Sequence, residues 1–227
     1  MHGSGCFVIP NPWDAGTAHY LEHLGFQALA TTSAGFAFSR GLRDGAVPRH
    51  AMLGHIHDIV QATSLPVNAD FQSGYSRDPE GVAANVMLCV ATGVAGLSIE
   101  DSTGDDTKPL YGGSVAVDRV RAARAAIDAS GTPVVLTARC EAWLVGASDP
   151  FRIAIERLVA YADAGADCLF APGVREPEDI TAIVKAVSPR SVNVLVSEPN
   201  PALSVDGTVS STTRRFSLLV IAPQTLV

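Results

Sequence analysis

Asp70, Glu100 and Arg139 are the residues of this 227-residue chain whose types and spacing best suit chemistry. Each lies at the end of a short apolar run. Carboxylates from neighbouring runs are the hard oxygen ligands that Mg²⁺ or Mn²⁺ prefers, and such ions keep several waters and accept substrate oxygens. Arg139 can clamp a carboxylate through two parallel hydrogen bonds. The pattern predicts a site for an acidic small molecule, with a metal stabilising an enolate-like oxygen.

A run of small residues, Thr32-Ser33-Ala34-Gly35, adds a second feature to this site. Small side chains let backbone N–H groups approach an anionic oxygen closely. Thr31 to Ser33, Asp70, Glu100-Asp101 and Arg139 all fall where predicted strands end. Their convergence favours a functional site, although Asp101 could instead be an ordinary helix N-cap.

The elements that must position these residues follow from an alternation of apolar runs and amphipathic segments. The predicted strands are residues 7–9, 28–33, 67–71, 97–100, 134–139, 168–171 and 192–196, with 216–221 as a candidate eighth. The predicted helices, which begin at acidic residues or Pro and end at Gly or Pro, are 14–24, 48–63, 78–93, 117–129, 150–164 and 176–187.

This alternation implies a parallel sheet with helical crossovers. Seven or eight units in one domain favour a (β/α)8 TIM-type barrel over residues 1–227, incomplete at its C-terminus. An open Rossmann-type sheet is the alternative, and it is weakened because no G-x-G-x-x-G follows the first strand. In a barrel the strand ends converge on one face, where active sites are built.

Composition excludes several classes of protein. The net charge is −7, and no Lys/Arg cluster offsets it, so we expect no nucleic-acid partner. No apolar run is long enough to cross a membrane, and the N-terminus lacks signal-peptide character, so we expect a cytoplasmic protein. The four cysteines are far apart, without metal-type spacing, and are expected to be reduced core thiols.

Five segments resemble the isocitrate lyase/phosphoenolpyruvate mutase superfamily, and the resemblance is clear over residues 7–196. They are Asn11-Pro12-Trp13-Asp14-Ala15, Thr31-Thr32-Ser33-Ala34-Gly35, residues 67–75 (VNADFQSGY), residues 96–101 (GLSIED) and Thr137-Ala138-Arg139-Cys140-Glu141-Ala142. The resemblance implies a Mg²⁺-dependent (or Mn²⁺-dependent) barrel. Such enzymes make or break C–C or C–P bonds beside the carboxylate of 2-oxo or 2-hydroxy acids.

Site residues are carried over from the resemblance position by position. It implies that Asp70 is the direct metal ligand and that Gln72 and Glu100 hold metal-bound waters. Arg139 would bind the substrate carboxylate, and Asp44 is an acid near the substrate. The resemblance gives the other substrate contacts to Thr32, Ser33 and Ala34 in the small loop, and to Trp13 on the pocket wall.

Several departures from the family pattern bear on the reaction. The loop of residues 101–111 has neither the Cys and His of an isocitrate-type lyase nor the Asn of a mutase, and Cys140 belongs to a different strand. Gln72 replaces an acid, and the sixth strand leads into Ala171-Pro172-Gly173 without the usual polar group. The chain begins almost at its first strand, and the match fades after Val196. We therefore expect shortened ends, so the homo-oligomer that is usual in the family stays an open expectation for this chain.

Three interpretations follow. The first is a Mg²⁺-dependent lyase that cleaves a C–C bond of a small 2-oxo- or 2-hydroxydicarboxylate through a metal-stabilised enolate. Its proton donor is unidentified, with Tyr75 or a metal-bound water as candidates. The second is a hydrolase of the oxaloacetate or phosphonopyruvate type. The third is a shortened, catalytically inactive member of the family.

Overall fold

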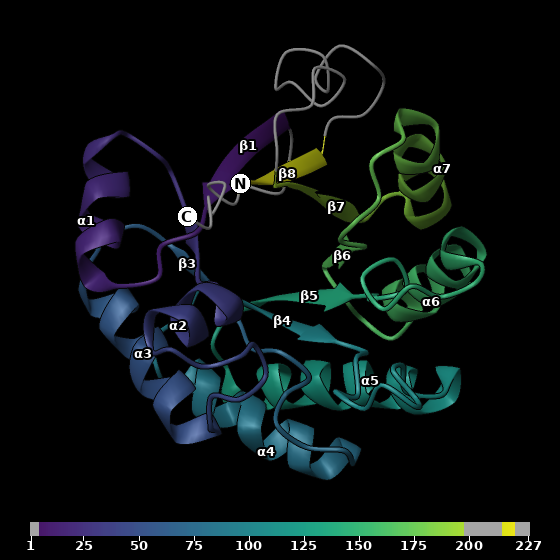
Figure 1. Ribbon diagram of the computed structural model, residues 1–227, viewed down its shortest axis with the longest axis horizontal. Coiled ribbons are helices and arrows are strands. Elements are labelled where there is room, and N and C mark those ends of the chain that lie inside the picture. Colours follow the sequence, from purple (N-terminus) through teal and green to yellow (C-terminus); the bar gives the residue numbers. More distant parts are fainter. Residues whose placement is uncertain (1–4, 198–214, 221–227) are drawn as a thin grey trace.

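The structure is a computed structural model that describes residues 5–197 and 215–220, with only the backbone described for 215–220. Figure 1 shows parallel strands around a central space, with most helices outside them. The strands are β1 (Gly5–Pro10), β2 (Leu29–Ala30), β3 (Val67–Asp70), β4 (Gly96–Glu100), β5 (Val135–Arg139), β6 (Cys168–Phe170), β7 (Ser191–Val196) and β8 (Arg215–Val220). The helices are α1 (Ala15–His23), α2 (Ser33–Ser39), α3 (Arg49–Gln61), α4 (Pro79–Val90), α5 (Gly113–Ser130), α6 (Pro150–Asp163) and α7 (Pro177–Val187).

All neighbouring strands pair in parallel, in the order β1-β8-β7-β6-β5-β4-β3-β2. From β8 to β2 the strands follow one another in sequence around the sheet, and β1 lies beyond β8. An open doubly wound sheet would instead reverse its strand order at a switch point. The order therefore confirms an α/β fold of the TIM-barrel type and excludes the Rossmann-type alternative.

A side chain, rather than a strand ladder, joins the two ends of this sheet. The ladders of the described strands do not include a β1–β2 pair. The buried amide of Asn11, just after β1, donates through Nδ2 to the carbonyl of Ala30, at 2.8 Å, and to that of Thr31, at 3.3 Å. Pro10 and Pro12 flank Asn11 and have no N–H to donate to a ladder. Asn11 thus supplies the side-chain bonds that bring the end of β1 to the end of β2.

Most predicted elements are confirmed within a few residues, and the differences have physical reasons. The run 28–33 contains a strand of only two residues, because Thr32 caps α2 by accepting a hydrogen bond from the Gly35 amide, at 3.1 Å. The helix predicted from 117 begins at Gly113. The candidate eighth strand is β8, although Ile221 lies outside the described residues, as does nearly all of the Pro/Ser/Thr-rich segment after Val196.

The core lies between the outer faces of the strands and the helices. Alternation along β4 and β5 sends one set of side chains outward, and Leu97, Ile99 and Leu136 are fully or almost fully buried there. The cysteines are free thiols, as predicted, and Cys89, Cys140 and Cys168 are buried. The helices of the described residues include none that is long and apolar enough to span a bilayer.

His55 on α3 gives the fold a testable pH dependence. Its ring is 94% buried and stacks on Phe36, with ring centroids 3.9 Å apart, and its Nε2 has no hydrogen-bond partner. Burial lowers the pKa of His55 to about 4, although Asp58 and Asp14 oppose the change. The unfolded state, in which the pKa is about 6.5, therefore binds more protons between pH 4 and 6.5. The contribution of the neutral, buried His55 to the free energy of unfolding is complete above pH 6.5 and is lost as the pH falls toward 4.

We expect the free energy of unfolding to fall by about 2 kcal/mol between pH 7.5 and pH 5 because of His55. Urea unfolding at the two pH values measures it. His55→Phe should remove this part of the pH dependence, whereas His57→Gln, at an exposed position of the same helix, should leave it unchanged. An unchanged slope in His55→Phe would contradict the prediction.

Candidate active site

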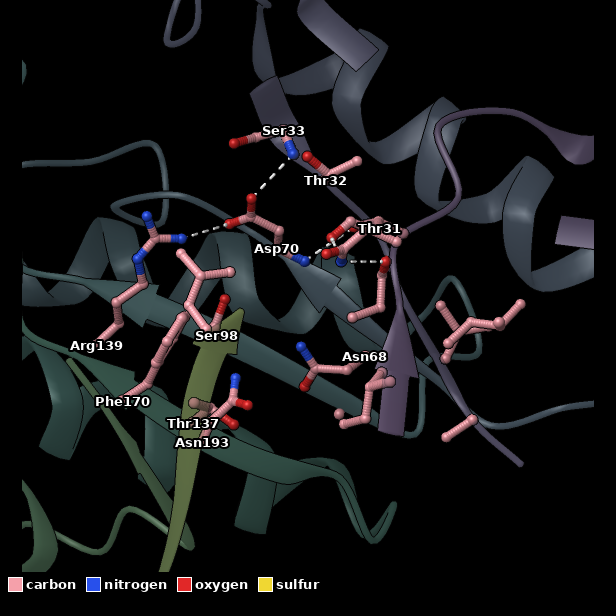
Figure 2. Close-up of a pocket in the computed structure, with 18 of the residues that line it drawn as sticks. Thr31, Thr32, Ser33, Asn68, Asp70, Ser98, Thr137, Arg139, Phe170 and Asn193 are labelled. Carbon is pink, nitrogen blue, oxygen red and sulfur yellow. Dashed lines mark hydrogen bonds and ion pairs between the residues drawn. The ribbon is translucent and has the colours of Figure 1, made fainter. Parts of the chain in front are cut away.

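The central space of the sheet contains a cavity of about 380 Å³, open at the carboxyl ends of the strands. Asp70, Arg139 and Ser33 face one another in it (Figure 2). Six residues that sequence reasoning assigned to the site line the cavity, namely Thr32, Ser33, Ala34, Asp44, Asp70 and Arg139. Glu100 meets Arg139, and Gln72 meets Asp44, so the structure brings eight of the nine assigned residues together.

Asp70, at the end of β3, accepts a hydrogen bond through only one of its two carboxylate oxygens. Its Oδ2 accepts a hydrogen bond from the Ser33 amide, at 2.9 Å, and its own amide donates to Thr31 Oγ1, at 2.9 Å. Its Oδ1 is buried without a hydrogen-bond partner and lies 3.6 Å from an Arg139 nitrogen. A fixed carboxylate with one unpartnered buried oxygen is suited to binding a cation, because a buried acceptor is costly to leave unpaired.

Arg139, at the end of β5, is surrounded by acids. Its Nε contacts Glu141 and lies 3.6 Å from Glu100 Oε2. Although burial opposes the change, the carboxylates of Glu141, Glu100 and Asp70 raise the pKa of Arg139 further above its ordinary value. The Phe170 ring lies below the guanidinium, with 5.4 Å from Cζ to the centroid. Arg139 is therefore a permanently charged, oriented donor at the cavity wall.

Three carboxyl groups, those of Asp70, Glu100 and Glu141, surround the single guanidinium of Arg139, and their protonation bears on whether a divalent cation fits. Burial raises the pKa of Glu100 to about 8, with Arg139 opposing and Glu141 and Asp70 adding to the change. Burial likewise raises the pKa of Glu141. The one guanidinium thus does not keep all three groups ionised at neutral pH, and a bound Mg²⁺ would favour their ionised, metal-binding forms.

The donor set fits an ion that keeps waters rather than a complete protein cage. Among the described residues, no three acid, histidine or cysteine side chains form a ready-made metal shell. Mg²⁺ usually binds through one or two carboxylates and retains several waters. Asp70 offers a carboxylate oxygen that accepts no hydrogen bond. Glu100 lies beside Arg139 and Gln72 beside Asp44, so both could hold waters of the ion.

Asp44 lies at the exposed mouth of the cavity and ties two loops together. Its Oδ1 accepts from Ser33 Oγ and from Gln72 Nε2, each at 3.2 Å, and from the Gly45 amide, at 2.9 Å. The loop after β2 and the loop after β3 therefore meet at one carboxylate. Asp44 can orient both Ser33 and Gln72 toward a ligand at the mouth.

Trp13 is the assigned residue that the structure places apart from this cavity. Its side chain is 38% exposed and borders a second, open hollow with Phe36 and His55, between α1, α2 and α3. A Cβ at Gly35 would lie 3.3 Å from the Trp13 Cβ, so the outer side of the small loop packs closely against Trp13. A direct substrate contact of Trp13 stays a prediction.

The loop after β3 adopts an unusual backbone next to the site. Gln72 and Tyr75 have positive φ angles of 49° and 56°, in the left-handed region that non-glycine residues rarely use, and Gly74 between them has φ 74°. Such conformations persist only where surrounding contacts enforce them, and they concentrate at functional sites. The Gly74 carbonyl is one such contact, because it accepts from Asn85 Nδ2, at 2.8 Å.

Arg119 on α5 supplies the other contacts to this loop. Its guanidinium is almost fully buried and donates to the carbonyls of Ser73, Ser76 and Arg77, and it lies 4.1 Å from the centre of the Tyr111 ring. A positively charged donor thus binds one carbonyl between the strained residues Gln72 and Tyr75 and two carbonyls directly after them. Arg119 is outside the cavity and acts on the site through the backbone of the loop.

Replacing Arg119 with methionine should lower the free energy of unfolding by about 3 kcal/mol. Hydrogen bonds to charged groups contribute about 1.5–3 kcal/mol each, and the packing of the methionine side chain offsets part of their loss. Arg121→Met is the matched control, since Arg121 is on the same helix with a side chain that is 62% exposed. Its effect should stay within about 0.5 kcal/mol. Urea unfolding of both variants tests the difference, and equal stabilities would refute the role of Arg119.

Tyr75, a candidate proton donor, and Cys140, which the sequence assigns to the core, are both buried. The Tyr75 hydroxyl is buried without a hydrogen-bond partner. Burial raises its pKa, and the carboxylates of Asp70, Asp44 and Glu100 raise it further, so Tyr75 keeps its proton. Cys140 is fully buried, and burial raises its pKa as well. Cys140 is therefore an inert core thiol, as the sequence predicts.

Asp101 is the centre of a buried hydrogen-bond network that the sequence did not predict, and its interpretation as a helix N-cap is wrong. It is not a helix N-cap, because α5 begins after Gly112. Its buried carboxylate accepts from the Glu141 amide (2.8 Å), Arg157 (2.8 Å) and the Tyr161 hydroxyl (2.7 Å). The network fixes Glu141, the acid that contacts Arg139. The sequence signal for Glu141 is its position two residues after Arg139, within the segment Thr137-Ala138-Arg139-Cys140-Glu141-Ala142, although the resemblance assigns it no role.

Comparison with known proteins places this geometry among enzymes of one family. The phosphoenolpyruvate phosphomutase family model matches residues 1–218. A provisionally named lyase/mutase from Burkholderia cenocepacia, of known structure, is 47% identical with a TM-score of 0.90, over 96% of this chain and 78% of its own.

Two further relatives carry named activities. The 2-methylisocitrate lyase of Escherichia coli K12 is 34% identical over 172 residues, which are 72% of this chain and 56% of the lyase. The structure of oxaloacetate acetylhydrolase in complex with its product oxalate is 28% identical with a TM-score of 0.84, over 95% of this chain and 75% of the hydrolase. The relatives thus include both a lyase and a hydrolase.

Proposed function

Because the chain belongs to the isocitrate lyase/phosphoenolpyruvate mutase superfamily, we propose that it is a Mg²⁺-dependent lyase that cleaves a C–C bond of a small 2-oxo- or 2-hydroxydicarboxylate. The observation that carries the proposal is the buried Oδ1 of Asp70, which accepts no hydrogen bond, within a cluster of three carboxyl groups beside Arg139. Such a cluster gains most from a divalent cation and a ligand that bridges the cation and the guanidinium.

The residues of the chain have distinct roles in this proposal. Asp70, with Gln72 and Glu100 through waters, would hold a Mg²⁺ ion, which supplies Lewis-acid stabilisation of the negative charge that develops on a substrate oxygen. Arg139 binds the substrate carboxylate, and its own position is set by Glu141 and Glu100.

The remaining residues orient the substrate and its surroundings. The Thr32-Ser33-Ala34 loop borders the same cavity as Arg139 and holds the other end of the acid. Asp44 orients Ser33 and Gln72 at the mouth. These groups are fixed before the ligand arrives, which lowers the entropic cost of reaching a reactive geometry.

A hydrolase is the second candidate, favoured by the residues of the loop after β4. Residues 101–111 contain no cysteine or histidine, and none of the four cysteines, Cys6, Cys89, Cys140 and Cys168, is among the described residues that line the cavity. A site without a thiol proton donor is compatible with water as the reacting partner. The oxaloacetate acetylhydrolase relative is named for such a reaction.

Product analysis separates the candidates. The purified chain is incubated with oxaloacetate and with 2-alkylmalates, in Mg²⁺ and in a chelator. The lyase proposal expects Mg²⁺-dependent cleavage with a 2-oxo acid as product, as judged by chromatography. Oxalate formed from oxaloacetate would favour the hydrolase instead. No turnover of any of these acids would contradict both and favour a catalytically inactive member.

A further inference from the structure

The cavity extends well below the residues that would hold the reacting groups. It runs from Asp44 and Leu144 at the mouth to Pro66 and Val135 at the opposite ends of the strands. An apolar protein cavity of about 150 Å³ is known to hold benzene, which has six non-hydrogen atoms. A cavity of about 380 Å³ therefore has room for more than the nine non-hydrogen atoms of a four-carbon dicarboxylate.

Strand periodicity arranges the lower part of the cavity in layers. Successive inward-facing residues of a strand are two positions apart, which is about 6.6 Å along the strand. Asn68, Ser98 and Thr137 are each two positions before a site residue, namely Asp70, Glu100 and Arg139 respectively. The next inward positions below them are Pro66, Gly96 and Val135. Figure 2 shows Asn68, Ser98 and Thr137 on the cavity wall beneath the Asp70–Arg139 pair.

The layer formed by Asn68, Ser98 and Thr137, here called the middle layer, is polar but uncharged. An amide and two hydroxyls from three adjacent strands line the cavity where TIM barrels usually have bulky branched side chains. Gly96 makes space for this layer, because a Cβ there would come within 2.7 Å of Asn68 Oδ1. The Asn193 amide of β7 lines the same part of the cavity.

Most of the remaining lining of the lower cavity is apolar, which limits what this part can hold. Its charged lining residues, among those the structure describes, are Asp44, Asp70 and Arg139, and none lies in the lower layers. The walls include Ile9, Leu195 and Phe170. A charged group there would be desolvated without a partner, whereas a hydroxyl or amide could pair with the middle layer.

We propose that the substrate is a 2-oxo or 2-hydroxy acid that carries an unbranched, uncharged extension with a terminal hydroxyl or amide, and that Asn68, Ser98 and Thr137 select this extension. The inference rests on the proposed function, because the acid end must bind at Asp70 and Arg139. One layer, about 6.6 Å, corresponds to an extension of about four to five bonds of about 1.5 Å each.

N-substituted oxamates test this proposal, because their acid end mimics oxalate and their tail can be varied. Calorimetry in Mg²⁺ compares oxamate, N-(4-hydroxybutyl)oxamate and N-pentyloxamate, of which the last two have tails of equal length. We expect the hydroxybutyl compound to bind about tenfold more tightly than oxamate. The pentyl compound should bind several-fold less tightly than the hydroxybutyl compound, because its methyl end cannot form a hydrogen bond with the amide and hydroxyls of Asn68, Ser98 and Thr137.

Two variants locate the selectivity. Ser98→Leu fills the middle layer and should remove the advantage of both tails over oxamate. Thr137→Val keeps the side-chain volume and should reduce only the preference for hydroxybutyl over pentyl. The readout is the ratio of affinities within each variant, so a general loss of stability cancels.

The outcomes separate this inference from the function on which it rests. If oxamate itself fails to bind in Mg²⁺, the proposed function and this inference both fall. If oxamate binds but neither tail improves affinity, only this inference is overturned. Equal affinities for the hydroxybutyl and pentyl compounds would also overturn it, because the polar layer would then select nothing.

Discussion

Replacing Arg139 with methionine should weaken the binding of oxalate in Mg²⁺ by a factor of about 10²–10³. Arg139 is the cation of the cavity that contacts three acids, and its fork geometry suits a ligand carboxylate. Removing one partner of a buried charge pair costs about 2–5 kcal/mol, and each 1.4 kcal/mol is a tenfold change in affinity. Calorimetric titration of oxalate into the wild type and the variant measures the loss.

Arg139→Lys is the matched variant for this prediction. It keeps the positive charge among Asp70, Glu100 and Glu141 but loses the planar fork, so we expect an intermediate affinity. The methionine variant should also be less stable, by about 3 kcal/mol, because it leaves buried carboxylates without their cation. An oxalate affinity within threefold of the wild type in Arg139→Met would show that Arg139 does not bind the ligand.

Replacing Asp101 with alanine should produce the largest loss of stability that a single change outside the cavity causes, about 3–5 kcal/mol. The variant leaves Arg157, the Tyr161 hydroxyl and the Glu141 amide without their shared acceptor. Asp101 is 97% buried, and water cannot readily replace the carboxylate there. The free energy of unfolding in urea is the measurement.

Two controls make the Asp101 result specific. Asp118→Ala removes a carboxylate that is 53% exposed and pairs with Arg121, and it should change stability by less than about 1 kcal/mol. Asp101→Asn keeps an acceptor but removes the charge, so its stability should fall between the wild type and Asp101→Ala. A loss below about 1 kcal/mol in Asp101→Ala would refute the importance of the network.

The sequence predicted the fold class and most of the site because both depend on local patterns. Strand alternation fixes which face each of Asp70, Glu100 and Arg139 occupies, and parallel pairing brings their strands together. The register then places Glu100 opposite Arg139. Periodicity and strand order were therefore enough to predict this cluster.

The features that the sequence did not reveal depend on long-range packing. Asn11 joins the ends of the sheet, and Arg119 contacts carbonyls more than forty positions away. Asp101 resembles a helix cap in sequence. It becomes the centre of a buried network because α6, which carries Arg157, packs against it in the fold. No local pattern distinguishes these residues from surface polar residues. Trp13 was placed by resemblance alone, and the packing of α2 puts it on the outer side of the small loop.

The central claim, a metal-dependent site for a small acid built on Asp70, is tested most directly by calorimetric binding of oxalate with and without Mg²⁺. We predict that the wild type binds oxalate only when Mg²⁺ is present and that Asp70→Ala abolishes this binding while the variant still unfolds cooperatively. Binding of oxalate that is independent of Mg²⁺, or that survives in Asp70→Ala, would contradict the claim.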